Sequence, residues 1–359
     1  MPRIKNSLVR QDDPVPDVFL SICIATFRRG AFIGETLGNL LAQTTPDVEL
    51  LVLDGGSPDN TEMVVRSFQE AYPGLRYIRQ ETNMGVDRDY NRAVELAREE
   101  YCWLITDDDL VTPRTVRRVL DACRNGYGFV IVNCEVRSID FSERIEERRL
   151  AVYEDREYGL KETEVFFAEI APYLQFIGAV VIRRSIWLAR EREKYYGTLF
   201  IHVGVIFQAT LPEKAYLISD PLITVRFGNA MWTPKMFEIW NFKWPGLVWS
   251  FSGYSDAAKR QVCAKEPWNR LLVLMLDRAK GVYSIDGYRK WIAPRMKSPV
   301  RRFGAAMIAL LPGFLINLMG IAWLSIIDRK YPLHLHDLRS SRYYYKSCMA
   351  RWFGKSGGT

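Results

Sequence analysis

The sequence predicts an α/β protein with a doubly wound, mainly parallel β-sheet and a helical C-terminal extension. Two patterns support this fold. Up to about residue 125, short apolar runs alternate with segments of helical periodicity, an order typical of parallel sheets covered by helices. Polar and turn-forming residues follow the apolar runs, and in open α/β sheets these carboxyl ends of strands are where ligands bind.

In the first third of the chain, each element follows from its side-chain pattern. The apolar runs at 18–26, 48–53, 75–79 and 101–106 are predicted as buried strands. Helical spacing of apolar residues predicts helices over 30–43, from Met63 to the Pro73-Gly74 pair, and through 90–97. The segment 54–61 is rich in Gly, Ser, Pro and Asp, so it is predicted as a loop.

The pattern continues beyond residue 107. Residues 110–113 are predicted as a turn into a helix, with Pro113 near the first helical position. The charged stretch 142–164 is interpreted as a solvated excursion. Several tryptophans after residue 229 indicate helices that pack over the first domain. Further strands are predicted at 128–134, at 177–182 with a helix at 186–188 behind it, and at 217–225.

Three adjacent carboxylates, Asp107, Asp108 and Asp109, follow the predicted strand 101–106. Like charges this close raise one another's pKa unless a cation neutralises them. Oxygen ligands suit Mg²⁺ or Mn²⁺, which hold a substrate phosphate in their remaining coordination positions. The alternative is a solvated acidic turn or a cluster at a helix start, where acidic residues are common.

The composition is that of a globular protein. A length of 359 residues with 48% hydrophobic and 25% charged residues predicts one large domain with an appendage, or two domains. The six cysteines form no C-x-x-C pair and several lie inside apolar runs, which fits a reducing cytoplasm. Residues 1–17 lack an apolar segment, so we expect a flexible lead-in and no secretory signal.

The C-terminal part is both basic and apolar. Residues 290–359 carry 12 Lys and Arg against two acidic residues, a net charge of +10. Residues 303–327 hold no charge, and at about 1.5 Å per residue they are long enough to cross a bilayer core. Because Pro312 interrupts them and basic residues flank both sides, we favour two short helices that lie in or dip into one leaflet. A single span and a buried helical hairpin are the alternatives.

Nucleic acid is the other partner that a basic tail suggests. The basic residues flank apolar segments, and the chain shows no nucleic-acid recognition motif. We therefore expect anionic lipid, and no nucleic acid, as the partner of this region.

Four motifs occur in order along the chain. Ala25-Thr26-Phe27-Arg28-Arg29 follows the first strand, and Asp54-Gly55-Gly56-Ser57 follows the second. Asn83-Met84-Gly85 precedes a helix that carries Asn91, and the three aspartates come last. This order resembles the nucleotide-binding half of the family 2 glycosyltransferases, which have the Rossmann-like GT-A fold. The resemblance covers about residues 18–125, and it is closest to bacterial abequosyltransferase-like O-antigen sugar transferases.

The resemblance implies a donor site. Family members carry P-T-Y-N after the first strand; Thr26 and Phe27 match it, while Arg28 replaces the asparagine. Asp54 matches an aspartate that commonly contacts the nucleobase in the family, and Gly55 replaces the second aspartate of that motif. The residues implied in donor binding are Thr26, Phe27, Arg28, Asp54, Gly55, Ser57, Asn83, Gly85, Arg88, Asp89 and Asp108.

Asp107 and Asp109 match the two metal-side positions of the family's D-x-D motif. The resemblance therefore implies Mn²⁺ or Mg²⁺ as cofactor and a nucleotide-diphosphate sugar as donor. Such a metal neutralises the charge that builds on the leaving diphosphate. Arg88 is a candidate for a second positive charge, and Asp89 and Asp108 for contacts to the donor sugar; a solvated or supporting role is the alternative for Arg88 and Asp89.

An inverting transfer needs a general base near the acceptor hydroxyl. Family members supply a carboxylate well downstream of D-x-D, where this chain has His202 within the apolar segment 199–210. His202 is the candidate base, with a satisfied core histidine as the alternative. Asp220 is the second candidate. The replacement of a carboxylate leaves open whether the reaction inverts or retains.

These features predict a nonprocessive hexosyltransferase of O-antigen or cell-surface polysaccharide synthesis. The resemblance implies a deoxyhexose from a CDP-sugar as donor and a polyprenyl-diphosphate-linked saccharide as acceptor, used at the cytoplasmic face of the bacterial inner membrane. A sugar-phosphate nucleotidyltransferase and a noncatalytic, membrane-bound partner with the same fold are the alternatives, and a homo-oligomer stays open.

Four regions are expected along the chain. They are a flexible lead-in at 1–17, a GT-A domain at 18–228, a helical Trp-rich acceptor and packing region at 229–299, and a basic, membrane-associating tail at 300–359.

Overall fold

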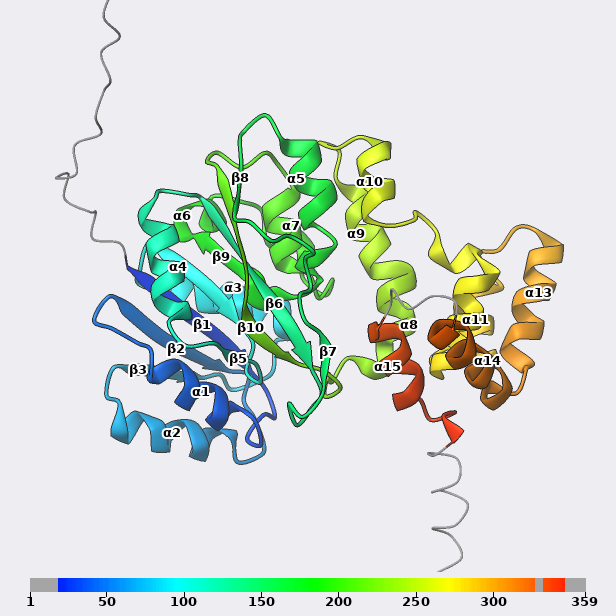
Figure 1. Cartoon of the computed structure of the whole chain (residues 1–359), viewed down its shortest axis with the longest axis horizontal. Helices are drawn as coiled ribbons and strands as arrows, with labels where there is room; N and C mark the ends of the chain where they lie inside the picture. Colours follow the sequence, from blue (N-terminus) through cyan, green and yellow to red (C-terminus); the bar gives the residue numbers. More distant parts are fainter. Residues whose placement is uncertain (1–18, 327–331, 346–359) are drawn as a thin grey trace, which may run out of the picture.

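The structure is a computed structural model that describes residues 19–326 and 332–345. The lead-in expected at 1–17 lies outside these residues, as do 327–331 and 346–359 of the tail. Helices flank a large, mainly parallel sheet, and further helices extend from one end of it (Figure 1). This arrangement confirms the α/β fold class.

The first four strands follow the predicted apolar runs closely and are parallel to one another. They are β1 (Leu20–Thr26), β2 (Val48–Asp54), β3 (Leu75–Arg79) and β4 (Tyr101–Ile105). β1 lies between β2 and β4, with Thr26 opposite Asp54 and Ile24 opposite Ile105. The loops after these three strands therefore meet at one edge of the sheet, where the predicted donor motifs lie.

The remaining strands make the sheet mixed. They are β5 (Leu110–Val111), β6 (Phe129–Arg137), β7 (Arg144–Glu146), β8 (Arg156–Tyr158), β9 (Val180–Arg183) and β10 (Ala215–Arg226). Among the described residues, the sheet has the order β3-β2-β1-β4-β9-β6-β10-β5, with β7 beside β6 and β8 beside β10. β6 and β10 are parallel, whereas β9 is antiparallel to both its neighbours.

One local expectation was wrong. The turn predicted at 110–113 contains β5, because Leu110 and Val111 pair with Thr224 and Ile223 of β10. There a distant strand supplies the backbone hydrogen bonds, and such pairing overrides a local turn pattern. The charged stretch 142–164 is largely exposed or half-buried, as expected of a solvated excursion, and it also contains the short strands β7 and β8, which pair with β6 and β10.

Helices α1 to α7 belong to the sheet domain. They are α1 (Ile33–Leu41), α2 (Thr61–Ala71), α3 (Val86–Leu96), α4 (Thr115–Arg124), α5 (Thr163–Ile170), α6 (Arg184–Leu188) and α7 (Ile201–Phe207). Pro113 lies two residues before α4, near its first position as expected. All seven residues of α7 are buried, which explains the unbroken apolar run that we saw at 199–210.

The C-terminal half is helical. α8 (Met236–Glu238), a π-helix (Ile239–Lys243) and α9 (Trp244–Ser250) follow one another directly. Beyond them lie α10 (Asp256–Val262), α11 (Leu271–Lys280), α12 (Ile285–Gly287), α13 (Pro299–Leu310), α14 (Gly313–Ile326) and α15 (Pro332–Ser340).

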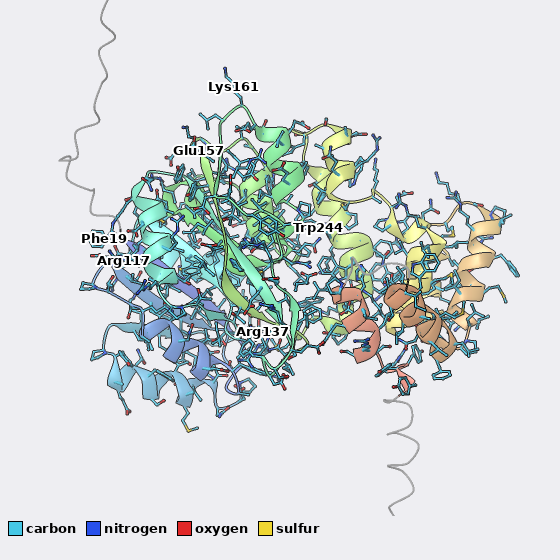
Figure 2. All side chains as sticks on the ribbon, in the orientation of Figure 1. Phe19, Arg117, Arg137, Glu157, Lys161 and Trp244 are labelled. Atoms are coloured by element: carbon cyan, nitrogen blue, oxygen red, sulfur yellow. The ribbon has the colours of Figure 1, made fainter. Side chains whose placement is uncertain are left out.

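The core of the sheet domain does not stop where the sheet ends. The main hydrophobic cluster continues through Trp244, Phe251 and Val262, so α9 and α10 pack on the sheet domain. A second cluster joins Phe237 to α11 and α13. Figure 2 shows Trp244 between the sheet and the C-terminal helices. The region boundary that we expected at 228/229 thus does not coincide with a break in the core.

The apolar segment 303–327 forms parts of two helices. Within the described residues, no single helix is long and apolar enough to cross a bilayer. α13 and α14 together have the length and composition of a span, but they are bent by 99° at their junction. The bend agrees with the interruption predicted at Pro312.

Candidate functional site

A cavity of about 540 Å³ lies at the carboxyl ends of β1 and β4. Its lining comes from the loop after β1, the start of α3, the loop after β4, the segment that enters α7, the segment after β10 and the helix at 236–243. Pockets of this size and mixed lining are typical small-molecule sites. The chain thus forms one cavity from segments as far apart in sequence as Ala25 and Trp240.

The cavity gathers most, but not all, of the predicted site residues. Those that line it are Thr26, Phe27, Asn83, Gly85, Asp89, Asp107, Asp108, Asp109 and His202. Those that do not are Arg28, Asp54, Gly55, Ser57, Arg88 and Asp220.

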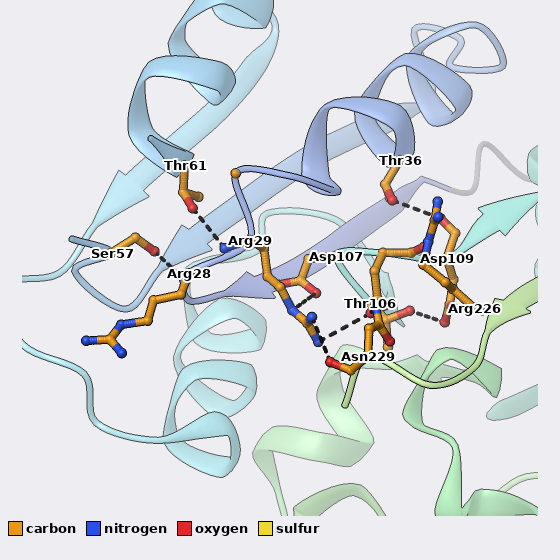
Figure 3. A network of polar contacts seen from close by, with 12 residues as sticks. Arg28, Arg29, Thr36, Ser57, Thr61, Thr106, Asp107, Asp109, Arg226 and Asn229 are labelled. Atoms are coloured by element: carbon orange, nitrogen blue, oxygen red, sulfur yellow. Dashed lines mark hydrogen bonds and ion pairs between the residues drawn. The ribbon is translucent and has the colours of Figure 1, made fainter. Parts of the chain in front are cut away.

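Asp107 and Asp108 face the same cation. The Nε atom of Arg29 lies 3.3 Å from Asp107 Oδ1, and its Nη2 atom lies 3.3 Å from Asp108 Oδ2 (Figure 3). The side-chain amide of Asn229 donates a 2.7 Å hydrogen bond to the same oxygen of Asp108. Burial, and then the charge of Asp108, raises the pKa of Asp107 to about 7. Asp107 and Asp108 thus share Arg29 as their counter-cation.

Asp109 points elsewhere. Its Oδ1 accepts a 2.7 Å hydrogen bond from the backbone N–H of Arg226 in β10, and its Oδ2 accepts one from the hydroxyl of Thr106. Burial and the nearby Asp108 raise its pKa well above the usual range. Both oxygens of Asp109 are thus bonded, one to the end of β10 and one within the loop after β4. The carboxylates that face Arg29 are therefore Asp107 and Asp108. We expected Asp107 and Asp109.

The donor set fits Mg²⁺ or Mn²⁺. The Nε and Nη2 atoms share one edge of the planar guanidinium, so the oxygens of Asp107 and Asp108 that contact them lie side by side. No three His, Cys, Asp or Glu side chains among residues 19–326 and 332–345 are grouped so that they could hold a metal. The protein thus offers two carboxylates, and Mg²⁺ commonly completes such a set with substrate phosphates and water.

Asp54 lies behind the cavity and is fully buried. Its Oδ1 accepts hydrogen bonds from the backbone N–H and the hydroxyl of Ser57, at 2.8 and 2.7 Å, and its Oδ2 accepts one of 2.6 Å from Tyr77. Ser57 in turn accepts a hydrogen bond from the backbone N–H of Arg28, which has a φ of +58°. In this structure Asp54 therefore supports the loop that carries Arg28.

Arg28 occupies the place of the family's asparagine. Asparagine tolerates the left-handed conformation better than other non-glycine residues, which fits the positive φ at this position. Figure 3 shows the Arg28 side chain directed away from Asp107. The expected donor contact from Arg28 is thus not prepared in the ligand-free protein.

The Asn83-Met84-Gly85 motif shapes the entrance to α3. Asn83 Oδ1 accepts a 2.7 Å hydrogen bond from the backbone N–H of Gly85, whose φ is +89°. A Cβ atom on Gly85 would meet no atom within 4 Å, so the space above it is open. A helix N-terminus with free space is a suitable place for a phosphate.

Gly55 and Asp89 are neighbours. A Cβ atom on Gly55 would lie 3.2 Å from Asp89 Oδ2, so the family's second aspartate would place a carboxylate against another one. Asp89 is buried, accepts a 2.7 Å hydrogen bond from Gln80, and has a pKa that burial raises. The replacement of that aspartate by Gly55 avoids a repulsion between like charges.

Two predicted residues lie away from the chemistry. The guanidinium of Arg88 lies 4.4 Å from the centre of the Tyr196 ring, which is a cation–π contact. Asp220 is exposed on β10 and does not line the cavity. The structure thus gives no support to Asp220 as the base, and it assigns Arg88 to a packing contact.

His202 is deeply buried, with 1% of its surface exposed. Its Nε2 atom lies 2.6 Å from the carbonyl oxygen of Leu174, and its Nδ1 atom has no hydrogen-bond partner among the described residues. Burial lowers the pKa of His202 to about 4. Because a carbonyl only accepts, Nε2 carries the proton of the neutral ring and Nδ1 has a free lone pair.

Asp87 positions the segment that carries His202. Its carboxylate accepts hydrogen bonds from the backbone N–H groups of Leu199 and Ile201, at 2.9 and 3.1 Å. Leu199 has a φ of +72°, so this turn is strained and Asp87 holds it. The contact links the start of α3 to the start of α7.

The sequence reasoning missed Arg29, Asn229 and Asp87. Arg29 lies three residues beyond β1, at the end of the first motif, and that place was the one available signal. Asn229 and Asp87 bind partners more than 100 residues away, and nothing in their local sequence marks these contacts.

Residues 21–187 match the family model described as glycosyl transferase family 2. Over 231 residues the chain is 23% identical to an abequosyltransferase from Salmonella typhimurium, a match that covers 61% of this chain and 69% of that relative. Over 116 residues it is 26% identical to a GalNAc(5)-diNAcBac-PP-undecaprenol beta-1,3-glucosyltransferase from Campylobacter jejuni. That match covers 32% of this chain and 38% of the relative.

The fold is similar to that of a mannosyltransferase from Pyrobaculum calidifontis, solved in complex with GDP-Man and Mn²⁺. The TM-score is 0.53 at 16% identity, and the superposition covers 96% of this chain and 89% of the other. At this identity the likeness concerns the fold alone, and it confirms the GT-A architecture.

Proposed function

Since the chain carries a family 2 glycosyltransferase domain over residues 21–187, we propose that it transfers a sugar from a nucleotide-diphosphate donor to a lipid-linked saccharide. One observation carries the proposal: Asp107 and Asp108 present two carboxylates to a single cation inside the cavity. In sugar transfer from a nucleotide diphosphate, negative charge builds on the leaving diphosphate, and a cation held at this place stabilises it.

The donor side of the cavity has residues for each part of the donor. Asp107 and Asp108 would hold Mn²⁺ or Mg²⁺, and such an ion would supply positive charge for the diphosphate. Asn229 orients Asp108 through its hydrogen bond, and Gly85 leaves room for a phosphate at the N-terminus of α3. Thr26 and Phe27, which follow β1 and line the cavity, would then face the nucleoside.

We assign the general base to Nδ1 of His202. Its free lone pair and its place in the cavity lining allow it to accept the proton of an acceptor hydroxyl. A pKa of about 4 is close to that of a free carboxylate, the group that other family members use for this step. A buried histidine with this pKa thus takes the role of the missing carboxylate without carrying a charge at rest.

We assign membrane docking to the bent helix pair. Its exposed apolar side chains include Phe303, Trp323 and Ile326, of which Ile326 is 75% exposed. Arg301 and Arg302 are exposed beside them at the start of α13. An apolar surface flanked by exposed arginines is typical of a helix that lies in the interface of an anionic leaflet.

A polyprenyl-diphosphate-linked saccharide fits this arrangement as acceptor, because it presents its sugar at a membrane surface. The relative from Campylobacter jejuni is named for such a polyprenyl-linked substrate. We place the protein at the cytoplasmic face of a bacterial inner membrane, where anionic lipid attracts the basic tail. Synthesis of O-antigen or another cell-surface polysaccharide is the process that this location and the abequosyltransferase relative favour.

Turnover of sugar nucleotides tests the proposal. Purified protein with Mn²⁺ is given CDP-, UDP-, GDP- and dTDP-sugars, with a CDP-deoxyhexose first, and release of the nucleoside diphosphate is measured. We expect release with one donor class, and a loss of about 100-fold or more in Asp107→Asn because the cation that stabilises the leaving group is lost. Asp256→Asn, which alters a surface ion pair with Arg260, is the matched control.

Several outcomes would contradict parts of the proposal. Release of a nucleoside triphosphate would indicate a nucleotidyltransferase. No turnover of any donor, with Asp107→Asn equal to wild type, would favour a noncatalytic partner. Loss of activity in Asp220→Asn together with full activity in His202→Gln would show that the base is wrongly assigned.

A further inference from the structure

We infer that Arg29 is an internal counter-cation, which holds Asp107 and Asp108 in the donor-free protein and turns to the donor's diphosphate once a divalent metal binds the two carboxylates. The inference rests on the proposed function, because it takes the donor to be a nucleotide diphosphate. It gives a role to Arg29, which the sequence left without one, and it assigns that residue two successive partners.

The contacts of Arg29 show what anchors it and what does not. Its backbone N–H donates a 2.9 Å hydrogen bond to the hydroxyl of Thr61, so the main chain is fixed to the start of α2. Its guanidinium contacts Asp107, Asp108 and, at 3.2 Å, the carbonyl oxygen of Asn229. The side chain is 12% exposed and lines the cavity. The guanidinium also lies 5.6 Å from the centre of the Phe32 ring, so its two ion-pair partners are the carboxylates proposed for the metal, and Asn229 and Phe32 are further contacts.

A comparison with Arg226 separates this role from a structural one. Arg226 donates to the carbonyl oxygens of Asp108 and Ile139, pairs with Glu35 and stacks on Phe141. None of these contacts uses the carboxylate of Asp107 or Asp108. The partners of Arg226 are therefore groups that a metal in the cavity would not bind. Both ion pairs of Arg29, in contrast, are with carboxylates that the metal would bind.

Charge and geometry make the two cations alternatives. The oxygens of Asp107 and Asp108 that lie side by side contact the Nε and Nη2 edge of Arg29, the place that a metal shared by both carboxylates would take. A hard divalent ion needs oxygen ligands at about 2.0–2.2 Å, which leaves no room for a guanidinium between them. Metal binding therefore displaces the Arg29 side chain.

The displaced guanidinium remains inside the cavity with a new partner at hand. A nucleotide diphosphate brings two phosphate groups to the same metal, and a planar guanidinium binds phosphate oxygens with two parallel hydrogen bonds. Arg29 thus keeps the buried carboxylates neutralised before the donor arrives and adds positive charge to the diphosphate afterwards. This makes Arg29 a ligand of the donor, and its two roles predict effects of opposite sign.

The experiment measures two affinities in Arg29→Gln. Binding of Mn²⁺ alone, followed by electron paramagnetic resonance, is expected to tighten about tenfold because the competing cation is gone. Binding of CDP, UDP and GDP at saturating Mn²⁺, followed by calorimetry, is expected to weaken about tenfold for the nucleotide that wild type binds best, because one charged phosphate contact is lost.

Arg149→Gln is the matched control. Arg149 lines the same cavity, but its ion pair is with Glu146, at 2.8 Å, and not with Asp107 or Asp108. Its removal lowers the positive charge of the cavity by the same amount, and we expect neither affinity to change by more than about twofold. Arg29→Lys keeps the charge without the two-nitrogen edge and is expected to give intermediate values for both affinities.

The signs of the two effects decide the outcome. Weaker binding of both Mn²⁺ and nucleotide in Arg29→Gln and Arg29→Lys would show a structural role and overturn the inference, as would unchanged Mn²⁺ affinity. Full transfer activity in excess EDTA would contradict the metal in the proposed function. Metal-dependent transfer together with unchanged affinities in Arg29→Gln would contradict the inference alone.

Discussion

Single residues that look alike in the sequence differ in what they contact. Asp107, Asp108 and Asp109 are adjacent carboxylates, yet the first two face Arg29 and the third binds the backbone of β10 and the hydroxyl of Thr106. Residues 106–109 lie in the loop after β4, so the alternation of a strand does not apply to them, and Asp109 is the one whose carboxylate reaches the backbone of β10. Substitution of Asp109 should thus disturb the junction of β4 and β10 first.

His202 predicts a pH dependence of stability. Its folded-state pKa of about 4 lies below the ordinary value of 6.5, so the unfolded chain binds this proton more readily. The stability that neutral His202 contributes is complete above pH 6.5 and is lost as the pH falls to 4, a loss of about 3 kcal/mol. His202→Gln, which retains a donor toward Leu174, should lose about that much less between pH 7 and pH 4.

Chemical denaturation at several pH values measures this difference. Wild type and His202→Gln should give free energies of unfolding that converge toward pH 4. Parallel pH curves for the two proteins would show that His202 is protonated as readily in the folded protein as in the unfolded chain. Parallel pH curves would also contradict the proposal that His202 is an uncharged base in the cavity.

At the scale of elements, α7 is held in place by a close contact. A Cβ atom on Gly204 would lie 2.3 Å from the ring of Tyr195, well inside van der Waals distance. Glycine inside a helix normally costs stability, so its presence here indicates that the ring needs the space. Since His202 lies on the same short helix, this contact sets the position of the proposed base.

Two glycine substitutions of opposite effect test this contact. Gly204→Ala is expected to lower the free energy of unfolding by about 1–3 kcal/mol, because the added methyl group displaces the Tyr195 ring. Gly246→Ala in α9, where an added Cβ meets no atom within 4 Å, should raise it by about 0.5–1 kcal/mol through helix propensity. Urea denaturation measures the free energy of unfolding of both variants. A Gly204→Ala protein more stable than wild type would contradict the proposed clash between the added methyl group and the Tyr195 ring.

At the scale of the whole molecule, the sheet domain and the bent helix pair lie at different ends (Figure 1). α9 and α10 pack on the sheet domain, and Phe237, just before the π-helix, packs against α11 and α13. Ile239 and Trp240, on the same run of helix as Phe237, line the cavity. One continuous run of helix thus connects the wall of the cavity with the helices that we assign to the membrane.

Vesicle binding tests the membrane assignment. Wild type should bind vesicles that contain anionic lipid, should bind neutral vesicles more weakly, and should be released by high salt. The double variant Phe303→Glu with Ile326→Glu should bind at least about tenfold more weakly, because charged groups do not enter the apolar layer.

Met63→Glu is the control for vesicle binding. Met63 is 66% exposed on α2, close to the 69% of Phe303, but it lies on the sheet domain. Equal vesicle binding by wild type and the double variant, or an equal loss in Met63→Glu, would contradict docking through α13 and α14.

The sequence by itself determined the fold class, the parallel strands that carry the motifs, and nine of the residues that line the cavity. These follow from local patterns: apolar runs set β1 to β4, and the loops after parallel strands necessarily meet at one edge of the sheet. The interruption of the helix at Pro312 could also be predicted from the local sequence, since proline removes a backbone hydrogen-bond donor wherever it lies.

Only the tertiary structure decided what each polar side chain contacts. β5 exists because β10 pairs with it, Asp109 is engaged because β10 offers it a backbone N–H, and Arg29 meets Asp107 because two separate loops converge. Asp87 holds the α7 turn across more than 100 residues. Contacts between segments so far apart depend on how the elements pack, and the residues around each side chain in the sequence do not indicate which distant residue it will contact.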